Sequence, residues 1–340
     1  MSYLKPLKSS AVPPRFRLVL VIAATVMTHR TMDAQTVNWV EVASGTPSAR
    51  TSMGMAYDGA THSTVLFGGA NSGTTYGDTW NWHEGWLQLF PATSPSARFG
   101  AGMAYDAAAG TIVLFGGNSS LIPGGTFLND TWTWDGITWT QQFPPVSPSA
   151  RTYMGMVYDA ATQTVVLFGG SNNAGVLGDT WTWNGVTKTW TQHNPSASPS
   201  PRGAPMAYDV ATRTAVLFGG GSGSVGVAYD DTWTWNGTTW TQQFPASTPP
   251  ALSGHAMTYD AALGVVVLFG GDVDSIWQET TNETWIWNGT DWTEIHPATV
   301  PPNRYLFGMD YDPIQHYVLM FGGYSSGPAL GDTWLLALEP

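Results

Sequence analysis

The sequence predicts an all-β fold, a six-bladed β-propeller built from four-stranded antiparallel blades. One phrase occurs six times along the 340 residues, and its third copy runs from Arg151 to Gln192. The pairs of adjacent glycines that mark the copies are 48 to 53 residues apart, close to the period of about 50 residues expected of a propeller blade. Apolar residues in each copy follow strand patterns, and none has a competing helical spacing.

The first two strands of each copy are defined by a short motif and an apolar run. The motif reads Gly-Met-Ala-Tyr-Asp at 54–58, and its Asp is expected to cap the turn that follows. The apolar run, as at 165–168, predicts burial on both faces. A glycine pair ends it, where positive φ or close backbone approach is expected. The six pairs are Gly68-Gly69, Gly116-Gly117, Gly169-Gly170, Gly219-Gly220, Gly270-Gly271 and Gly322-Gly323.

The last two strands are rich in tryptophan. The third strand reads Asp-Thr-Trp-Thr-Trp, and its period of two places both indoles on one face. Asn-Gly or Asp-Gly follows in four copies, which favours a type I′ hairpin because both central residues of that turn need positive φ. The fourth strand carries one more Trp, such as Trp139, that is expected to meet those indoles and to add about 0.5–1.5 kcal/mol beyond burial. We therefore interpret the repeated Trp residues as core.

The chain ends are expected to close the ring together. The sixth copy stops after its third strand, at 332–338, and has no fourth strand. The segment Val37–Glu41 precedes the first copy as a fourth strand precedes every later one, with Trp39 as the counterpart of Trp139. The N-terminal strand should thus complete the last blade and remove two open edges.

Residues 1–34 have the features of a secretory signal peptide, so the propeller is expected to span 35–340. Four basic residues precede an apolar run from Leu18 to Met27, and Ala34-Gln35 is a candidate cleavage point. The run is too short to span a bilayer, which needs about 20 residues. This pattern predicts a secreted, periplasmic or cell-surface protein without a membrane span.

Charge and cysteine content exclude some partners and chemistries. Removing residues 1–34 takes away five of the 12 basic residues and one of the 24 acidic ones, so the net charge falls from −12 to −16. Such a surface repels phosphate backbones, and we expect no nucleic-acid partner. The sequence has no Cys, which excludes disulfides and thiol chemistry. We also expect a monomer.

The repeat resembles the kelch-repeat β-propellers. An apolar strand, a double glycine and spaced aromatics recur over essentially all of residues 36–340. The usual Tyr of the third strand is Trp here, for instance Trp181 or Trp183. The resemblance extends to the central domain of galactose oxidase as a fold. It implies no copper site, because that chemistry needs a Cys crosslinked to a Tyr.

An arginine and an acidic residue recur at fixed places in the copies. The arginines Arg50, Arg98, Arg151 and Arg304 each stand eight residues before the Asp of the first strand, whereas Arg202 stands seven before its own. The fifth copy has Leu252 in place of Arg and Glu283 in place of the third-strand Asp. Because both changes fall in one copy, we predict an Arg–Asp ion pair within or between blades. The alternative is a ring of arginines that reads an anionic ligand.

Functional residues are expected where the copies differ. The loops between second and third strands are long and variable, and topology places them on the same face as the links between blades. Trp277 lies in one such loop among Asp272, Asp274 and Glu279, which suits a sugar or a protein patch, or a weak Ca²⁺ site at Asp272-x-Asp274; a solvated acidic loop is equally consistent. The other candidate ligand-binding aromatics outside the repeated set are Tyr76, Phe127, Tyr229 and Tyr324.

His255 stands near the expected central channel. It occupies a first-strand position that the other copies fill with Met, Ala or Phe, and it is either a hydrogen-bonded core residue or a site residue. We predict a secreted propeller that binds a glycan or an extracellular protein through its long-loop face, without a cofactor. The alternative is a carbohydrate-active lyase, epimerase or hydrolase at the channel mouth, with His255, Asp272 and Asp274 as the best acid–base set.

Overall fold

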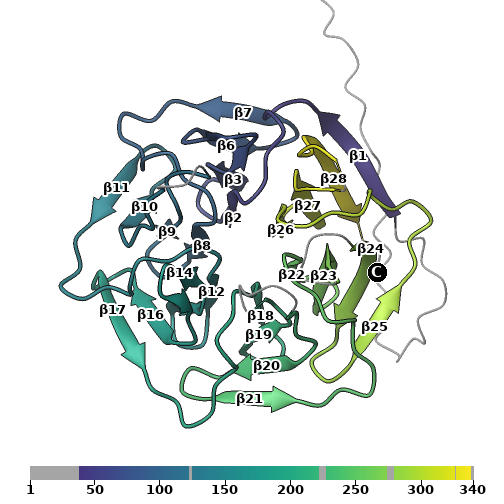
Figure 1. Cartoon of the computed structure of the whole chain (residues 1–340). Coiled ribbons are helices and arrows are strands. Elements are labelled where there is room, and N and C mark those ends of the chain that lie inside the picture. Colours follow the sequence, from purple (N-terminus) through teal and green to yellow (C-terminus); the bar gives the residue numbers. More distant parts are fainter. Residues whose placement is uncertain (1–37, 122–124, 222–226, 274–278, 326, 338–340) are drawn as a thin grey trace, which may run out of the picture. The chain divides into compact units, whose positions relative to one another are not determined.

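The protein folds into a ring of six four-stranded antiparallel sheets (Figure 1). The computed structural model describes residues 38–121, 125–221, 227–273, 279–325 and 327–337. Within these residues the secondary structure is entirely β, so they include no helix that could cross a membrane. The predicted fold class is confirmed.

Each blade consists of strands a to d, from the channel outward. The strands of blades 1 to 3 are β2 (Gly54–Asp58), β3 (Ser63–Phe67), β6 (Thr79–Trp82) and β7 (Trp86–Leu89); β8 (Gly102–Asp106), β9 (Thr111–Phe115), β10 (Thr131–Trp134) and β11 (Trp139–Gln142); β12 (Gly155–Asp159), β13 (Thr164–Phe168), β16 (Thr180–Asn184) and β17 (Thr189–His193). The strands of blades 4 to 6 are β18 (Met206–Asp209), β19 (Thr214–Phe218), β20 (Thr232–Trp235) and β21 (Trp240–Gln243); β22 (Ala256–Asp260), β23 (Val265–Asp272), β24 (Thr280–Trp287) and β25 (Trp292–Ile295); β26 (Gly308–Asp312), β27 (Tyr317–Phe321), β28 (Asp332–Ala337) and β1 (Asn38–Ser44). Two b–c loops also form small hairpins, β4 (Ala70–Asn71) with β5 (Thr74–Thr75) and β14 (Ser171–Asn172) with β15 (Gly175–Val176).

The N-terminal strand closes the ring as predicted. β1 pairs antiparallel with β28, with Trp39 opposite Leu336, and so provides strand d of blade 6. The a strands contact one another in order around the channel, and β26 contacts β2 (Figure 1). The closed ring therefore leaves no blade without a neighbour.

Strand b and its glycine pair explain how closely the blades pack. The b strand of blade 3 is fully buried from Val165 to Phe168, because a sheet on each side covers it. Gly68 and Gly69 have φ of 71° and 95°. A Cβ on Gly68 would lie 2.5 Å from the Arg98 carbonyl oxygen of the next blade. Both expected reasons for glycine, positive φ and close approach, therefore apply.

The c–d turns differ from the predicted type I′ hairpins. Trp235 pairs with Trp240, so the turn contains four residues rather than two. Only Gly237 within it has positive φ, at 94°. The Asn236 side chain instead accepts hydrogen bonds from the Thr238 and Thr239 amides. The type I′ prediction was wrong, because the Asn carboxamide organises a longer loop as an Asx turn.

A layer of tryptophan connects neighbouring blades. Within a blade, the second strand-c indole packs on the strand-d indole, as for Trp183 and Trp190 at 5.3 Å between centroids. Each strand-d indole also donates to the threonine that directly precedes the first strand-c Trp of the preceding blade. The six bonds are Trp86 to Thr333, Trp139 to Thr79, Trp190 to Thr131, Trp240 to Thr180, Trp292 to Thr232 and Trp39 to Thr284. The predicted core role is confirmed, and the same residues fasten the ring.

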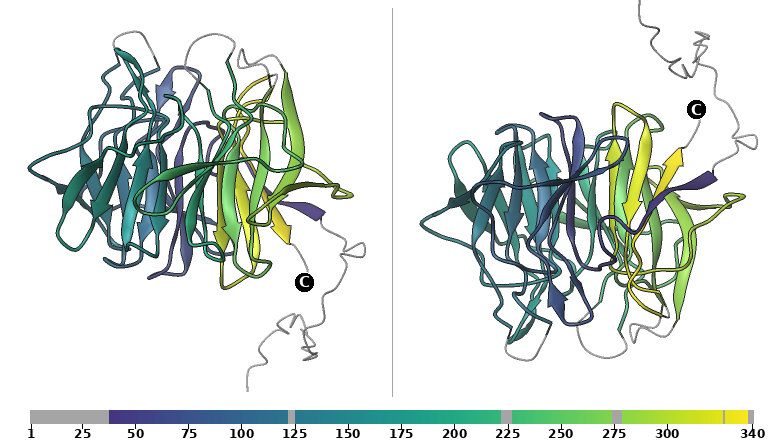
Figure 2. Two further views of the ribbon diagram at one scale, coloured as in Figure 1. Left: turned by 90° about the horizontal axis from the view of Figure 1, so that it is seen from below. Right: turned by 90° about the horizontal axis from the view of Figure 1, so that it is seen from above.

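The two faces of the ring carry different loops (Figure 2). On one face the a–b and c–d turns meet, since the Gly185 amide of blade 3 donates to Asp106 at the a–b turn of blade 2. On the other face the b–c loops meet the links between blades, as where the Arg98 amide donates to the Tyr76 carbonyl. The second face, which we call the long-loop face, is the one predicted to bind.

Candidate functional site at the channel mouth

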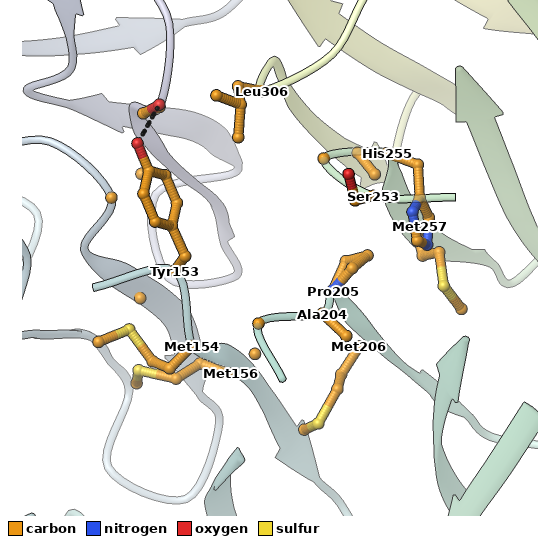
Figure 3. Close-up of a pocket in the computed structure, with 18 of the residues that line it drawn as sticks. Tyr153, Met154, Met156, Ala204, Pro205, Met206, Ser253, His255, Met257 and Leu306 are labelled. Carbon is orange, nitrogen blue, oxygen red and sulfur yellow. Dashed lines mark hydrogen bonds between the residues drawn. The ribbon is translucent and has the colours of Figure 1, made fainter. Parts of the chain in front are cut away.

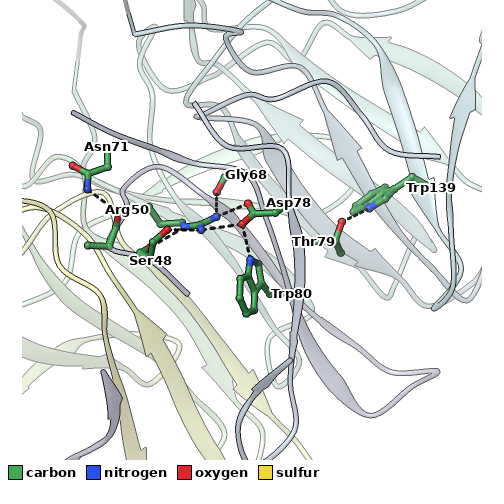
Figure 4. Close-up of polar contacts among 9 residues, drawn as sticks. Ser48, Arg50, Gly68, Asn71, Asp78, Thr79, Trp80 and Trp139 are labelled. Atoms are coloured by element: carbon green, nitrogen blue, oxygen red, sulfur yellow. Dashed lines mark hydrogen bonds and ion pairs between the residues drawn. The ribbon is translucent and has the colours of Figure 1, made fainter. Parts of the chain in front are cut away.

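The repeated arginines and acids pair within five of the six blades, as one of the predicted arrangements required (Figure 4). Arg50 Nη1 lies 2.6 Å from Asp78 Oδ1 and also donates to the Gly68 carbonyl. The same carboxylate accepts from the Trp80 indole. The five pairs are Arg50–Asp78, Arg98–Asp130, Arg151–Asp179, Arg202–Asp231 and Arg304–Asp332.

These pairs connect neighbouring blades and are not open to a ligand. The Arg50 backbone bonds to Leu330 and Gly323 of blade 6, while its side chain lies in blade 1. The five arginines are 0 to 1% exposed, which rules out the alternative of an arginine ring that reads an anion in solution. Burial opposes ionisation of Asp78, but the hydrogen bonds from Arg50 and Trp80 outweigh it and hold its pKa below the usual value.

Blade 5 shows how the pair can be replaced. Leu252 takes the place of the arginine and is fully buried in the apolar core. Among the described residues, Glu283 accepts from the Trp285 indole. The paired substitution predicted from the sequence is thus a local exchange of an ion pair for apolar packing.

Two of the predicted ligand-binding aromatics belong to this scaffold. The Arg50 guanidinium lies 4.0 Å from the Tyr76 ring centroid, and Arg202 lies 3.6 Å from that of Tyr229. Each ring therefore covers a buried ion pair through a cation–π contact.

The other predicted residues spread over the long-loop face. Tyr324 stacks on Tyr305 with centroids 5.9 Å apart, Phe127 is half-buried and Glu279 is exposed. Asp272 is fully buried, so it is no surface ligand, and burial and the charge of Asp272 raise the pKa of Tyr305. Asp274 and Trp277 lie outside the described residues, so the Ca²⁺ site and the aromatic-plus-carboxylate patch stay predictions.

A cavity occupies the central channel where it opens on the long-loop face. It has a volume of about 530 Å³ and is lined by the a strands and the residues before them (Figure 3). Eight methionines line it: Met53, Met55, Met103, Met154, Met156, Met206, Met257 and Met309.

The methionines also lock the a strands together. A Cβ on Gly102 would lie 2.4 Å from Met156 Sδ and 3.0 Å from Met154 Sδ of the next blade. The Gly-Met of the repeat therefore places a side chain of one blade in the space that glycine leaves in its neighbour. Flexible thioether side chains give the wall an apolar surface that can adapt to a ligand.

A ring of backbone hydrogen bonds surrounds the channel mouth. Its members, which we call the mouth ring, are Ser52, Gly100, Tyr153, Gly254 and Leu306. All five have φ between 54° and 63°, which is uncommon for Ser, Tyr and Leu. The Gly100 amide donates to Ser52, Tyr153 to Gly100, Leu306 to Gly254 and Ser52 to Leu306.

The side chains of the mouth ring do not repeat. Tyr153 faces Pro205 and Ser253 across the cavity (Figure 3), and its hydroxyl lies 3.4 Å from Ser52 Oγ. Tyr153, Leu306 and Pro205 escaped the sequence predictions, which followed the loop aromatics. An alignment of the copies by strand register would have found them. Tyr153 and Leu306 are the large residues of a column that otherwise holds serine and glycine, and Pro205 stands in a column of glycine and alanine.

His255 lines this cavity, as its predicted place near the channel implied. It is 5% exposed and packs edge-on against Phe218, with centroids 5.7 Å apart. Burial lowers its pKa to about 3, against an opposing contribution from the Phe218 backbone. The imidazole is therefore neutral at physiological pH and a poor proton acceptor. Among the described residues, no three His, Asp or Glu side chains group as metal ligands would.

Comparison with known proteins identifies the repeat. Residues 81–247, from strand c of blade 1 to just past strand d of blade 4, match the family model of the KLHDC2/KLHL20/DRC7 Kelch-repeats domain. No curated protein matches the chain.

Proposed function

We propose that this chain, which belongs to the kelch-repeat β-propellers, binds a protein partner through the channel mouth on its long-loop face. Kelch-repeat propellers are generally protein-interaction modules. The closer likeness to the central domain of galactose oxidase stays a prediction.

One observation carries this proposal: the cavity at the channel mouth opens where the repeat is least regular. The Trp layer, the ion pairs and two of the loop aromatics are engaged in holding blades together. The mouth instead presents Tyr153, Leu306 and Pro205, each different from its counterparts in the other blades. Variation on a constant scaffold is typical of a recognition surface.

The chemistry of the mouth favours a peptide over a glycan. Methionine and other apolar side chains dominate its wall, whereas sugar sites need several polar groups to match hydroxyls. The glycan partner predicted from Trp277 depends on residues outside the described part of the chain. The enzyme alternative would rest on His255, whose low pKa does not suit acid–base work at neutral pH.

A display selection tests the proposal. The full chain is screened against a random-peptide library and a glycan array, together with Tyr153→Ala and the control Ile137→Ala. Ile137 is 79% exposed at a c–d turn, on the opposite face. We expect peptides that bind wild type and Ile137→Ala but not Tyr153→Ala. Binding of glycans alone, turnover of a sugar, or peptides that ignore Tyr153 would each overturn it.

We also propose that the protein acts outside the cytoplasm, as a monomer, after removal of residues 1–34. The basic, apolar and small-residue order of that segment supports export. N-terminal sequencing of the protein from its native host should find Gln35 or a residue near it first. An N-terminus at Met1 in the mature protein would contradict this.

A further inference from the structure

We infer that the mouth ring contains a subsite for one amino-acid residue of an extended peptide, at the place where blade 4 lacks a residue. This inference rests on the proposed function, because it names what the partner inserts there.

The missing residue follows from chain length. In the other five blades the Asp that ends strand a stands eight residues after the residue equivalent to Arg202, whereas Asp209 stands seven after it. Gly203 still forms the bridge to its b–c loop, with Gly221, that Thr51 forms with Ala70 in blade 1. Ala204 then stands in the place of Met53, because a Cβ on Gly220 would meet the Ala204 side chain as one on Gly69 would meet that of Met53. The residue removed is therefore the blade-4 member of the mouth ring.

The removal leaves one donor and one acceptor of the ring unpaired. Four of the five ring amides donate to the carbonyl of the preceding member, and the blade-4 member would have connected Tyr153 to Gly254. Within the described part of the chain, the Tyr153 carbonyl accepts no hydrogen bond and the Gly254 amide donates none. A peptide residue has the matching set, an N–H for Tyr153 and a C=O for Gly254.

The buried Ser253 hydroxyl at the same place also lacks a hydrogen-bond partner among the described residues. Ser253 is 4% exposed and lines the cavity, and its hydroxyl has no hydrogen-bond partner among the described residues. A buried polar group without a partner is unfavourable unless something bound satisfies it. Its position next to Gly254 places a third polar group at the subsite.

Small residues keep the subsite open. A Cβ on Gly203 would lie 2.7 Å from the Tyr153 carbonyl oxygen, so any larger residue would cover that acceptor. Pro205 stands where blades 1, 2, 3 and 6 have glycine at the start of strand a. Because proline has no backbone N–H, this position donates no hydrogen bond. The occupant is thus recognised by its backbone, in the way strand addition recognises a peptide.

Amide NMR of the full chain tests the subsite with a minimal probe. The probe is N-acetylglycine N-methylamide, a single residue with an amide on each side. Without it, the Gly254 amide should exchange with solvent much faster than the amides of Leu306 and Ser52. Added probe should shift the Gly254 resonance and slow its exchange.

Three variants make the test specific. One glycine inserted between Gly203 and Ala204 restores the length of the other blades and should abolish the response to the probe while protecting Gly254. Ser253→Ala should weaken binding of the probe roughly fivefold and leave the melting temperature of the protein unchanged. A glycine inserted between Gly237 and Thr238, in the c–d turn of the same blade, is the control and should leave the response intact.

Two results would overturn the subsite: a Gly254 amide as protected as Leu306 before any probe is added, or no shift up to the solubility limit of the probe. Failure of the subsite and failure of the proposed function are distinguishable. If selected peptides bind both wild type and the variant with glycine inserted between Gly203 and Ala204, the proposed function stands and the subsite fails. If the probe shifts the Gly254 resonance but no library peptide binds the protein, the subsite stands and the proposed function fails.

Discussion

The Trp39 indole donates a hydrogen bond of 3.3 Å to Thr284 Oγ1, 245 residues further along the chain. Trp39 is fully buried and packs against Phe269, with centroids 4.9 Å apart. The contact repeats between blades 6 and 5 what Trp139 and Thr79 do between blades 2 and 1. It completes a ring of six equivalent bonds.

Replacing Trp39 should open the ring. Trp39→Ala is expected to lower the free energy of unfolding by about 3–5 kcal/mol, the range for buried Trp or Phe truncated to Ala. Trp39→Phe keeps an aromatic ring and loses mainly the hydrogen bond, worth about 1 kcal/mol. Urea unfolding followed by Trp fluorescence measures both. A loss below about 1 kcal/mol for Trp39→Ala would mean that β1 does not hold blade 6 closed.

The buried ion pairs should be costly to break. Arg151→Ala leaves Asp179 and the Gly169 carbonyl without their partner, and a broken buried pair costs about 3–5 kcal/mol. Thermal unfolding measures the effect. An unchanged melting temperature would contradict the scaffold role.

Blade 5 supplies the control for that experiment. Arg151→Leu combined with Asp179→Glu reproduces the Leu252 and Glu283 arrangement. It should lose less stability than Arg151→Ala, because a leucine fills the space of the arginine with apolar packing, as Leu252 does in blade 5. If the double variant is less stable than the single one, the exchange seen in blade 5 depends on other residues of that blade.

His255 should make stability depend on pH. Its pKa falls from 6.5 in the unfolded chain to about 3 in the folded one. The stabilisation is therefore complete above pH 6.5 and is lost as the pH falls toward 3, by about 1.4 kcal/mol per pH unit. His255→Phe should lack this loss, because Phe307 fills the same position in blade 6. Urea unfolding from pH 7 to pH 4 measures the free energy of unfolding of both proteins. If it changes with pH equally in both, the pKa of His255 is not lowered in the folded state.

Repetition made most of the fold predictable. Six copies allowed the blade count, the glycine pairs, the Trp core and the closing strand to be read by comparison alone, and the structure confirms each. The c–d turn was wrong because Asn236-Gly237 fits a two-residue turn and a longer Asx loop equally well. Asp310 was also overlooked. It accepts from the Tyr57 amide and the Thr258 hydroxyl and so connects blades 5, 6 and 1.

The site was harder to predict because it depends on where the repeat fails. Tyr76 and Tyr229 looked free in sequence, but a guanidinium lies against each ring. The seven-residue spacing after Arg202 was visible in the sequence. Its consequence, a missing member of the mouth ring, could be recognised only from the backbone hydrogen bonds of the structure. His255 was placed near the channel correctly because strand register is fixed by the pattern on either side of it.

Hydrogen–deuterium exchange with a display-selected peptide tests the central claim most directly. Peptide bound to the full chain should slow exchange at 52–54, 100–102, 153–155, 253–256 and 306–308, around the channel mouth. The c–d turns on the opposite face, such as 236–239, should exchange as before. Protection confined to those turns, or to the outer d strands, would contradict the assignment of the channel mouth as the binding site.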